Sequence, residues 1–204
     1  INAHFLCNTL GTINYEAIEA GNRKVSLLIK KLSNILRYTF DQKCQNVYMS
    51  QEFAWIEQYL YLQKARFEDA FDYEIDLQEE YDMWPCCKLM LQPFVENAII
   101  HGFKGREIGG MLKIMAKGQG EYIKIVINDN GYGIPEEREK AIQEIIKGND
   151  VSDDLRIGIG IRNVVARIHI FYGDSAQISL WSKEGEGTKF EFLLPYPERK
   201  EECI

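Results

Sequence analysis

Two segments in the second half of the chain carry polar side chains of the kinds that contact nucleotides. Asn97 and His101 stand four residues apart on an expected helix, and an asparagine oxygen that lines a pocket can hold Mg²⁺ together with substrate phosphates. Asp129 follows a strongly apolar strand, where its carboxylate can accept the exocyclic amine of adenine. Gly131 and Gly133 follow within four residues and allow the backbone to approach a flat base closely.

A third segment places two glycines at the expected start of a helix. Gly158 and Gly160 would leave backbone N–H groups pointing toward an anion, which is a common way to hold phosphate. The spacing differs from the dinucleotide-binding pattern G-x-G-x-x-G, because Asn163 stands where the third glycine would be, and it does not match the P-loop either. Each of the three segments also has an ordinary structural interpretation, as an amphipathic helix, a tight turn or a helix start. Only their combination and order favour a nucleotide site.

The N-terminal stretch INAHFLCNTL contains a histidine that can be a packing residue, a ligand or a nucleophile. A neutral imidazole is a competent nucleophile near pH 7, because its reference pKa of about 6.5 leaves it mostly unprotonated. On a helix, His4 shares a face with Asn8, Gly11 and Tyr15 and not with the apolar residues. This placement favours an exposed ring, whereas a lone histidine in apolar surroundings is more often part of a core.

Composition limits the classes of function. The chain has 204 residues, of which 46% are hydrophobic and 27% are charged, as is typical of a globular protein. A net charge of −7 argues against nucleic-acid binding, because few phosphates could be neutralised. The five cysteines are odd in number and include no C-x-x-C pair, so neither a disulfide framework nor a zinc site is predicted. No apolar run reaches the length of a membrane span, and the start at Ile1 indicates a fragment, upstream of which a membrane segment can lie.

The first 70 residues are expected to be helical. Apolar residues recur at spacings of three and four over residues 1–40, although Gly21 and Asn22 interrupt the pattern and are expected to bend the helix. After a polar turn, Ser50 is a suitable N-cap for a second helix over residues 51–68. Two antiparallel helices cannot enclose a core by themselves, so we expect a second copy to complete a four-helix bundle.

From residue 71 the pattern changes to strands alternating with helices. The expected strands, and then the expected helices, cover residues 71–77, 111–117, 122–128, 177–182 and 188–194, and residues 86–102, 135–148 and 158–172. Five strands with three helices predict an α+β sandwich, in which the helices cover one face of a sheet. We therefore place a domain boundary at residue 70.

In this order, four segments resemble the nucleotide-binding motifs of a known superfamily. They are V-E-N-A-I-I-H at 95–101, D-N-G-Y-G-I-P at 129–135, G-I-G-I-R-N at 158–163 and G-E-G-T-K-F at 185–190. The set is similar to the motifs of the Bergerat ATP-binding fold, which is shared by gyrases, chaperones, histidine kinases and mismatch-repair proteins. The N-terminal INAHFLCNTL and the stretch 59–67 resemble LytS/YesM-type sensor histidine kinases, so the resemblance covers essentially the whole chain.

The resemblance implies a role for each residue singled out above. His4 would be the phosphoacceptor of a dimerisation and histidine phosphotransfer domain that covers residues 1–70. An ATP-binding catalytic domain, residues 71–204, would hold Mg²⁺ through Asn97 and adenine through Asp129. The other ATP-binding residues that the resemblance implies are His101, Gly131, Gly133, Gly158, Gly160, Arg162, Asn163 and Thr188.

The resemblance carries a few finer implications. Residues 136–157 would form a mobile lid over ATP, and the Thr188 hydroxyl would support the adenine-binding carboxylate through a water molecule. Arg162 and Arg167 are candidates for phosphate contact, with a structurally paired arginine as the alternative. No general base is identified, because Glu96 points about 100° away from the neighbouring asparagine on a helix.

The implied activity is that of a two-component sensor histidine kinase core. Such a chain would bind ATP and Mg²⁺, phosphorylate His4, and pass the phosphoryl group to an aspartate on the receiver domain of a response regulator. It would act as a homodimer through its N-terminal helices and would not bind nucleic acid. It would form the cytoplasmic portion of a bacterial membrane protein whose sensor region lies upstream.

Three positions depart from the family pattern. Ala3 stands where relatives have Pro, Cys7 where they have Phe, and Ile100 where many have a basic residue that can contact the γ-phosphate. These departures leave open a nucleotide-binding signalling scaffold without kinase activity. An ATPase that hydrolyses ATP for motion is disfavoured, because Pro93 occupies the position of the catalytic carboxylate in those enzymes.

Overall fold

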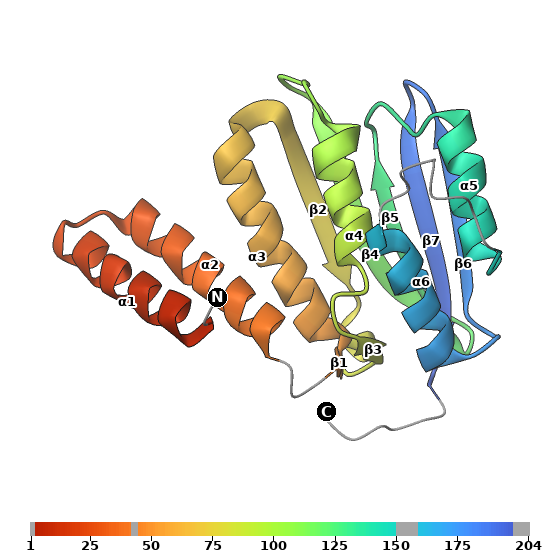
Figure 1. Cartoon of the computed structure of the whole chain (residues 1–204), viewed down its shortest axis with the longest axis horizontal. Helices are drawn as coiled ribbons and strands as arrows, with labels where there is room; N and C mark the ends of the chain where they lie inside the picture. Colours follow the sequence, from red (N-terminus) through yellow and green to blue (C-terminus); the bar gives the residue numbers. More distant parts are fainter. Residues whose placement is uncertain (1–2, 42–44, 150–158, 198–204) are drawn as a thin grey trace.

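The computed structural model describes residues 3–41, 45–149 and 159–197. In Figure 1, a pair of helices projects from one end, and a layer of helices covers one face of a sheet. The elements are α1 (Ala3–Glu19), α2 (Arg23–Phe40), β1 (Asn46–Tyr48), α3 (Met49–Phe67), η1 (Glu68–Ala70), β2 (Phe71–Leu77), η2 (Glu79–Tyr81), β3 (Pro85–Cys87), α4 (Gln92–Asn97), η3 (Ala98–Gly102), β4 (Gly110–Gln119), β5 (Tyr122–Asp129), α5 (Glu136–Ile146), α6 (Ile159–Tyr172), β6 (Gln177–Lys183) and β7 (Gly187–Pro195). This architecture confirms the predicted α+β class with an N-terminal helical hairpin.

Residues 3–40 form two helices, not the single bent helix that the apolar pattern predicts. At their junction Gly21 adopts a φ of +68°, a conformation that side chains disfavour and that reverses the chain here. Asn22 then caps α2, because its side-chain oxygen accepts a hydrogen bond from the Val25 N–H at 3.1 Å. Ser26 Oγ donates to Asn14 Oδ1 at 2.7 Å and ties α2 to α1. The expected bend is therefore a tight turn, and α1 with α2 makes the hairpin.

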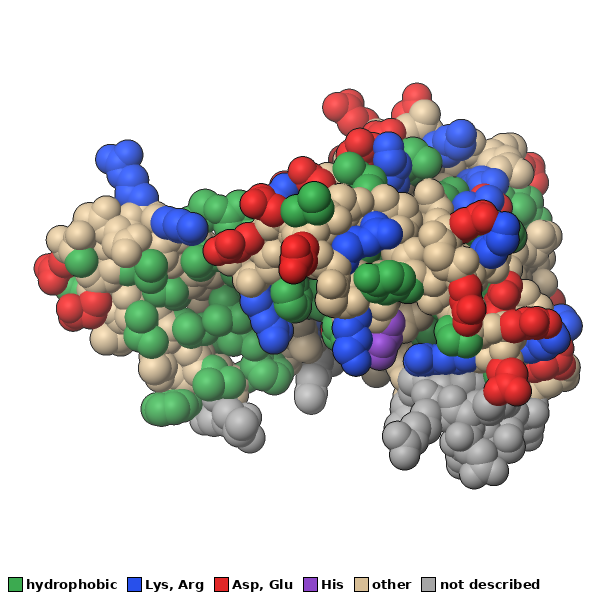
Figure 2. All heavy atoms as spheres, turned by 90° about the horizontal axis from the view of Figure 1, so that it is seen from above, with side chains coloured by type: hydrophobic (Ala, Val, Ile, Leu, Met, Phe, Trp, Pro, Cys, Tyr) green, Lys and Arg blue, Asp and Glu red, His purple; other side chains and the backbone are tan. Residues whose placement is uncertain are grey.

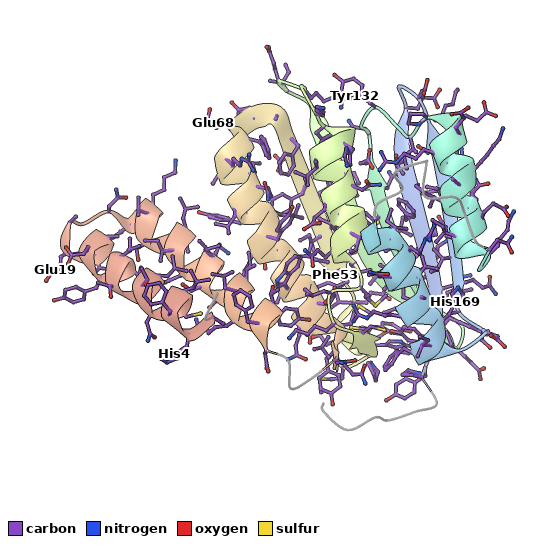
Figure 3. The ribbon with its side chains drawn as sticks, viewed as in Figure 1. His4, Glu19, Phe53, Glu68, Tyr132 and His169 are labelled. Carbon is purple, nitrogen blue, oxygen red and sulfur yellow. The ribbon has the colours of Figure 1, made fainter. Side chains whose placement is uncertain are left out.

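The helix α3, expected to pair with residues 1–40, packs against both α2 and the sheet domain. Its buried residues Phe53, Ile56 and Leu60 belong to one hydrophobic core together with residues of the strands. Figure 3 labels Phe53 between α3 and α4, on the side of α3 away from the hairpin. A four-helix bundle would therefore combine α1 and α2 of two copies, without α3. The domain boundary at residue 70 stays a prediction.

The main sheet has five strands in the order β2-β4-β5-β7-β6. β2 runs parallel to β4, and the other neighbours are antiparallel. On β5 the alternating isoleucines Ile123, Ile125 and Ile127 are buried, as expected for a sheet with one face covered. Figure 1 shows α3, α4, α5 and α6 on that face. The register of β5 with β7 sets Asp129 opposite Thr188, so two predicted site residues meet at the end of the central strands.

The helix expected over residues 86–102 is wrong in its first part. Residues 85–87 form β3, which pairs with β1 in a small second sheet, and α4 begins only at Gln92. The intervening loop is held by the buried carboxylate of Glu52, which accepts hydrogen bonds from the N–H groups of Leu89 at 2.8 Å and Leu91 at 3.1 Å. Because these amides donate to the Glu52 side chain of α3, the loop does not form an N-terminal extension of α4.

Candidate active site

A pocket of about 160 Å³ opens between α4, the loop after β5, and β7. Five of the residues predicted for nucleotide binding line it, namely Asn97, His101, Asp129, Gly133 and Thr188. Its apolar lining comes from Phe94, Ala98, Ile134 and Phe190. A drug-sized ligand commonly occupies about 300 Å³ or more, so this pocket has the size to enclose a base and to leave the rest of a nucleotide at its mouth.

Asp129 ends β5 with only 6% of its surface exposed. Its Oδ1 accepts a hydrogen bond from the Gly131 N–H at 2.8 Å, and the Thr188 N–H also donates to the carboxylate. Burial raises the pKa of Asp129 to about 6, against the lowering effect of these two donors and of Arg106. The side chain is thus a buried acceptor in an apolar pocket, which is what an adenine amine requires.

The loop after Asp129 touches the helix segment opposite, and this contact requires glycine. A Cβ on Gly131 would lie 2.5 Å from the carbonyl oxygen of Gly102, and the same oxygen accepts a hydrogen bond from the Tyr132 N–H at 2.9 Å. Gly133 has a φ of +74°, and a Cβ there would collide with the carbonyl of Lys183. The two predicted glycines therefore fix the wall of the pocket through close backbone packing.

The motifs do not reveal a buried pair of hydroxyls behind Asp129. Ser182 Oγ accepts from the Ile134 N–H at 2.8 Å, donates to the Gly187 carbonyl at 3.0 Å, and lies 3.1 Å from Thr188 Oγ1. Thr188 therefore supports Asp129 through its backbone N–H, and support through its hydroxyl and a water molecule stays a prediction. The available signal was a serine at an inward position of β6, where strand alternation predicts an apolar residue.

The segment that carries Asn97 and His101 changes its hydrogen-bonding pattern beside the pocket. After α4, residues 98–102 form a π-helical turn, in which the Phe103 N–H donates to the Ala98 carbonyl at 3.0 Å. Such turns are frequent at functional sites. Both predicted side chains line the pocket from this segment.

The mouth of the pocket is basic. Burial lowers the pKa of His101, and the neighbouring charges of Arg138 and Lys104 lower it further, so the imidazole is neutral at pH 7. Arg138, the third residue of α5, lines the pocket although no motif includes it. Glu96 does not line the pocket, and its Oε1 accepts a hydrogen bond from Gln92 Nε2 at 2.7 Å. The structure therefore offers no reason to assign Glu96 as the general base.

The residues predicted at the start of α6 do not share this pocket. Arg162 lines a second hollow, between α5 and α6, and Asn163 is exposed. Gly160 is near the second residue of α4, where a Cβ would meet Pro93 at 3.5 Å. Gly158 lies outside the described residues. Phosphate contacts from this helix start stay a prediction.

Two other expectations concern the lid over ATP and the phosphate contact of Arg167. Of the residues expected to form the lid, 136–146 form α5, whose Ile142 and Ile145 are buried in the core, and residues 150–157 lie outside the described residues. Arg167 Nη2 donates to the Lys88 carbonyl at 2.6 Å. Arg167 is therefore structurally paired with the loop before α4, as its alternative interpretation held.

His4 lies on α1 with its side chain exposed, as its helical face predicts. The side-chain nitrogen of Asn8, one turn later, lies 3.3 Å from His4 Nδ1 and helps to orient the ring. Figure 3 shows His4 on the hairpin and Tyr132, from the loop beside Asp129, on the other side of α3. In this arrangement His4 does not reach the pocket of its own chain.

The residues at the pocket fit Mg²⁺ only together with a nucleotide. Within residues 3–41, 45–149 and 159–197, no group of three or more His, Cys, Asp or Glu side chains could hold a metal ion. Asn97 supplies one amide oxygen at the pocket. Mg²⁺ commonly takes one or two protein ligands and completes its shell with phosphate oxygens and water.

Comparison with known proteins decides the family. The model of histidine kinases matches residues 1–71, and the model of histidine kinase-, DNA gyrase B- and HSP90-like ATPases matches residues 87–198, more than half of the chain. The chain belongs to the histidine kinases of this ATPase family. Sensor protein kinase HptS of Staphylococcus aureus, in strains USA300 and NCTC 8325, is 31% identical over 192 residues. The match covers 94% of this histidine kinase chain and 36% of HptS, so the chain spans about a third of the length of these relatives.

Solved structures agree on the fold of this histidine kinase chain. The histidine kinase domain of the Erythrobacter litoralis EL346 blue-light activated histidine kinase aligns with a TM-score of 0.54 at 14% identity, covering 95% of this chain and 94% of that one. The catalytic domain of histidine kinase ThkA aligns with a TM-score of 0.52 at 15% identity, covering 75% and 97%. In the part of the chain that the structure describes, no helix has both the length and the apolarity needed to cross a membrane.

Proposed function

We propose that this chain binds Mg·ATP in the pocket, transfers the γ-phosphoryl group to His4, and passes it to an aspartate of a response-regulator receiver domain. The observation that carries the proposal is the convergence of Asn97, His101 and Asp129 on one pocket, in a histidine kinase whose His4 is exposed on a separate hairpin. Asp129 would hold the adenine amine, and Asn97 would share Mg²⁺ with the phosphates. The bound ion would neutralise the charge that develops on the transferred group.

The transfer requires little covalent chemistry from the protein. A ring nitrogen of His4 attacks the γ-phosphorus with its lone pair, the bond from that phosphorus to the β–γ bridging oxygen breaks, and ADP leaves. The imidazolium that forms then releases its proton. The contribution of the chain is to position the two reactants and to exclude water from the base pocket.

A second copy would bring another pocket to the hairpin. Figure 2 shows hydrophobic side chains gathered over the hairpin end of the molecule. The exposed apolar residues on α1 and α2 include Ile13, Ile18, Val25, Leu27 and Leu32. Covering them with the same face of a partner would create the dimer and its four-helix bundle. The dimer would form the cytoplasmic part of a membrane-bound sensor.

The proposal is tested with γ-labelled ATP on the native chain, His4→Gln and Asp129→Asn. We expect acid-labile, alkali-stable label on the native chain and none on either variant, while His4→Gln still binds an ATP analogue and Asp129→Asn does not. Label that survives in His4→Gln would identify another acceptor. Analogue binding without any label on the native chain would favour the signalling scaffold, and phosphate release without label would favour hydrolysis.

A further inference from the structure

His101 and Arg138 line the pocket from two separate segments, and Lys104 lies near His101. His101 comes from the π-helical turn, Lys104 follows it, and Arg138 comes from α5. Arg138 is half-buried and lines the pocket beside Asn97 and His101. Both cations lie close enough to His101 to act on its charge. Figure 2 shows a histidine with Lys or Arg side chains on both sides of it on the face that it views.

This convergence has no evident structural reason. In the described residues, Lys140 of α5 pairs with Glu136 and Lys147 with Glu144, whereas neither Arg138 nor Lys104 forms an ion pair with a carboxylate. The chain carries 31 acidic residues against 24 basic ones, so acidic partners are plentiful. The positive charge of Arg138, half-buried beside the pocket and not paired with a carboxylate, favours an anion in the pocket.

The position of Arg138 in α5 also favours an anion at the pocket. It stands at the third position of α5, and the other charged residues of that first turn are Glu136, Glu137 and Glu139. The N-terminal end of a helix carries partial positive charge, which favours acidic side chains and disfavours a cation. An anion at the mouth of the pocket would be stabilised by both the helix end and the guanidinium.

We propose that Arg138 contacts the phosphate chain of the bound nucleotide and supplies the positive charge that Ile100 does not. Ile100 precedes His101 on the π-helical turn, and its apolar side chain, which is 52% exposed, supplies no charge there. A guanidinium can bind phosphate through two parallel hydrogen bonds, which makes it a strong substitute for an ammonium group. Arg138 would thus make the site prefer ATP over adenosine. The inference rests on the proposed function of the pocket as an ATP site.

The test compares two ligands on the native chain and on Arg138→Gln, with adenosine as a probe of the base pocket and a Mg-bound, non-hydrolysable ATP analogue as a probe of the phosphates. We expect Arg138→Gln to bind the analogue about tenfold more weakly, as for the loss of one charge-assisted contact, and to bind adenosine within a factor of two of native. Arg138→Lys, which keeps the charge but loses the fork, should fall between.

Two further variants complete the design. Lys140→Gln makes the same change of charge two residues later on α5, at an exposed side chain, and should leave both affinities unchanged. Ile100→Lys added to Arg138→Gln should restore most of the affinity for the analogue.

Three results would separate the possible failures. Equal weakening of adenosine and analogue in Arg138→Gln, or no weakening of either, would overturn the role of Arg138 while leaving the ATP site intact. Rescue that fails with Ile100→Lys would overturn the claim that the two positions exchange one function. A native chain that binds neither ligand would instead overturn the proposed function itself.

Discussion

At the residue scale, we expect Asp129 to make nucleotide binding depend on pH. Burial raises its pKa from 3.8 to about 6, so the folded chain binds this proton more tightly than the unfolded chain does. The stability that the protonated carboxyl contributes is therefore fully present below pH 3.8 and is lost as pH rises through 6. Adenine requires the ionised form as acceptor. We expect the affinity for adenosine to rise about tenfold from pH 5 to pH 7, following the ionised fraction of a group with this pKa.

Titration of adenosine at pH 5, 6 and 7 measures this effect, and adenosine is chosen because it carries no phosphate that would titrate. Asp72→Asn is the matched control, since Asp72 is an exposed aspartate whose pKa is lowered by Lys64. It should leave the profile unchanged, whereas Asp129→Asn should abolish binding at every pH. A flat native profile would contradict the role given to Asp129.

The sequence predicted the part of the site that depends on local spacing. Asp129 and Gly133 share one loop, and Asn97 and His101 share one turn of helix, so motifs suffice to find them. Arg138 was not predicted as a site residue, because its position depends on how α5 packs beside the pocket. No local sequence pattern records this packing.

At the element scale, Glu52 joins the hairpin to the nucleotide-binding domain. This fully buried carboxylate accepts a hydrogen bond from Tyr38 of α2 at 3.0 Å, besides the two amides of the loop before α4. Burial raises the pKa of Glu52, and all three donors oppose that shift by favouring the ionised form. We expect Tyr38→Phe to lower the free energy of unfolding by about 1–2 kcal/mol, because a buried acceptor loses one donor. Urea denaturation measures the change.

The hairpin offers a close control for this substitution. Tyr15 of α1 also hydrogen-bonds to a glutamate, Glu19, but this pair lies in solvent. Tyr15→Phe should therefore leave the stability unchanged, since water replaces the lost partner. Equal changes in the free energy of unfolding for the two substitutions would show that burial of the Tyr38 hydrogen bond does not add to stability.

The same carboxylate explains where the fold could not be predicted. Strands such as β2 follow a strict alternation and lie where the pattern places them. The segment before α4 is apolar enough for a helix, but residues 85–87 pair with β1, and the amides of Leu89 and Leu91 bind the distant side chain of Glu52. The turn at Gly21 is the opposite case. The glycine was visible in the sequence, but it was expected to bend a helix and not to reverse the chain.

At the scale of the whole molecule, the distance between His4 and the pocket makes association the deciding question. The hairpin exposes Ile13 and Leu32, at 47% and 37%, and a charged side chain at each would disfavour burial against a second copy. We expect Ile13→Glu with Leu32→Glu to turn a dimer into a monomer in sedimentation experiments. The monomer should still bind the ATP analogue, because both substitutions lie on the hairpin, away from the pocket.

A control with the same chemistry separates loss of the interface from added charge. Ile108→Glu with Ile170→Glu changes two isoleucines that are 73% and 83% exposed and lie outside the hairpin, so the dimer should persist. If transfer occurs between copies, the hairpin variant should also lose the label on His4. Mixing this variant with excess His4→Gln should restore the label only if mixed dimers form. A hairpin variant that stays dimeric would place the contact elsewhere, and a monomer that labels His4 at the native rate would show that the hairpin swings to its own pocket.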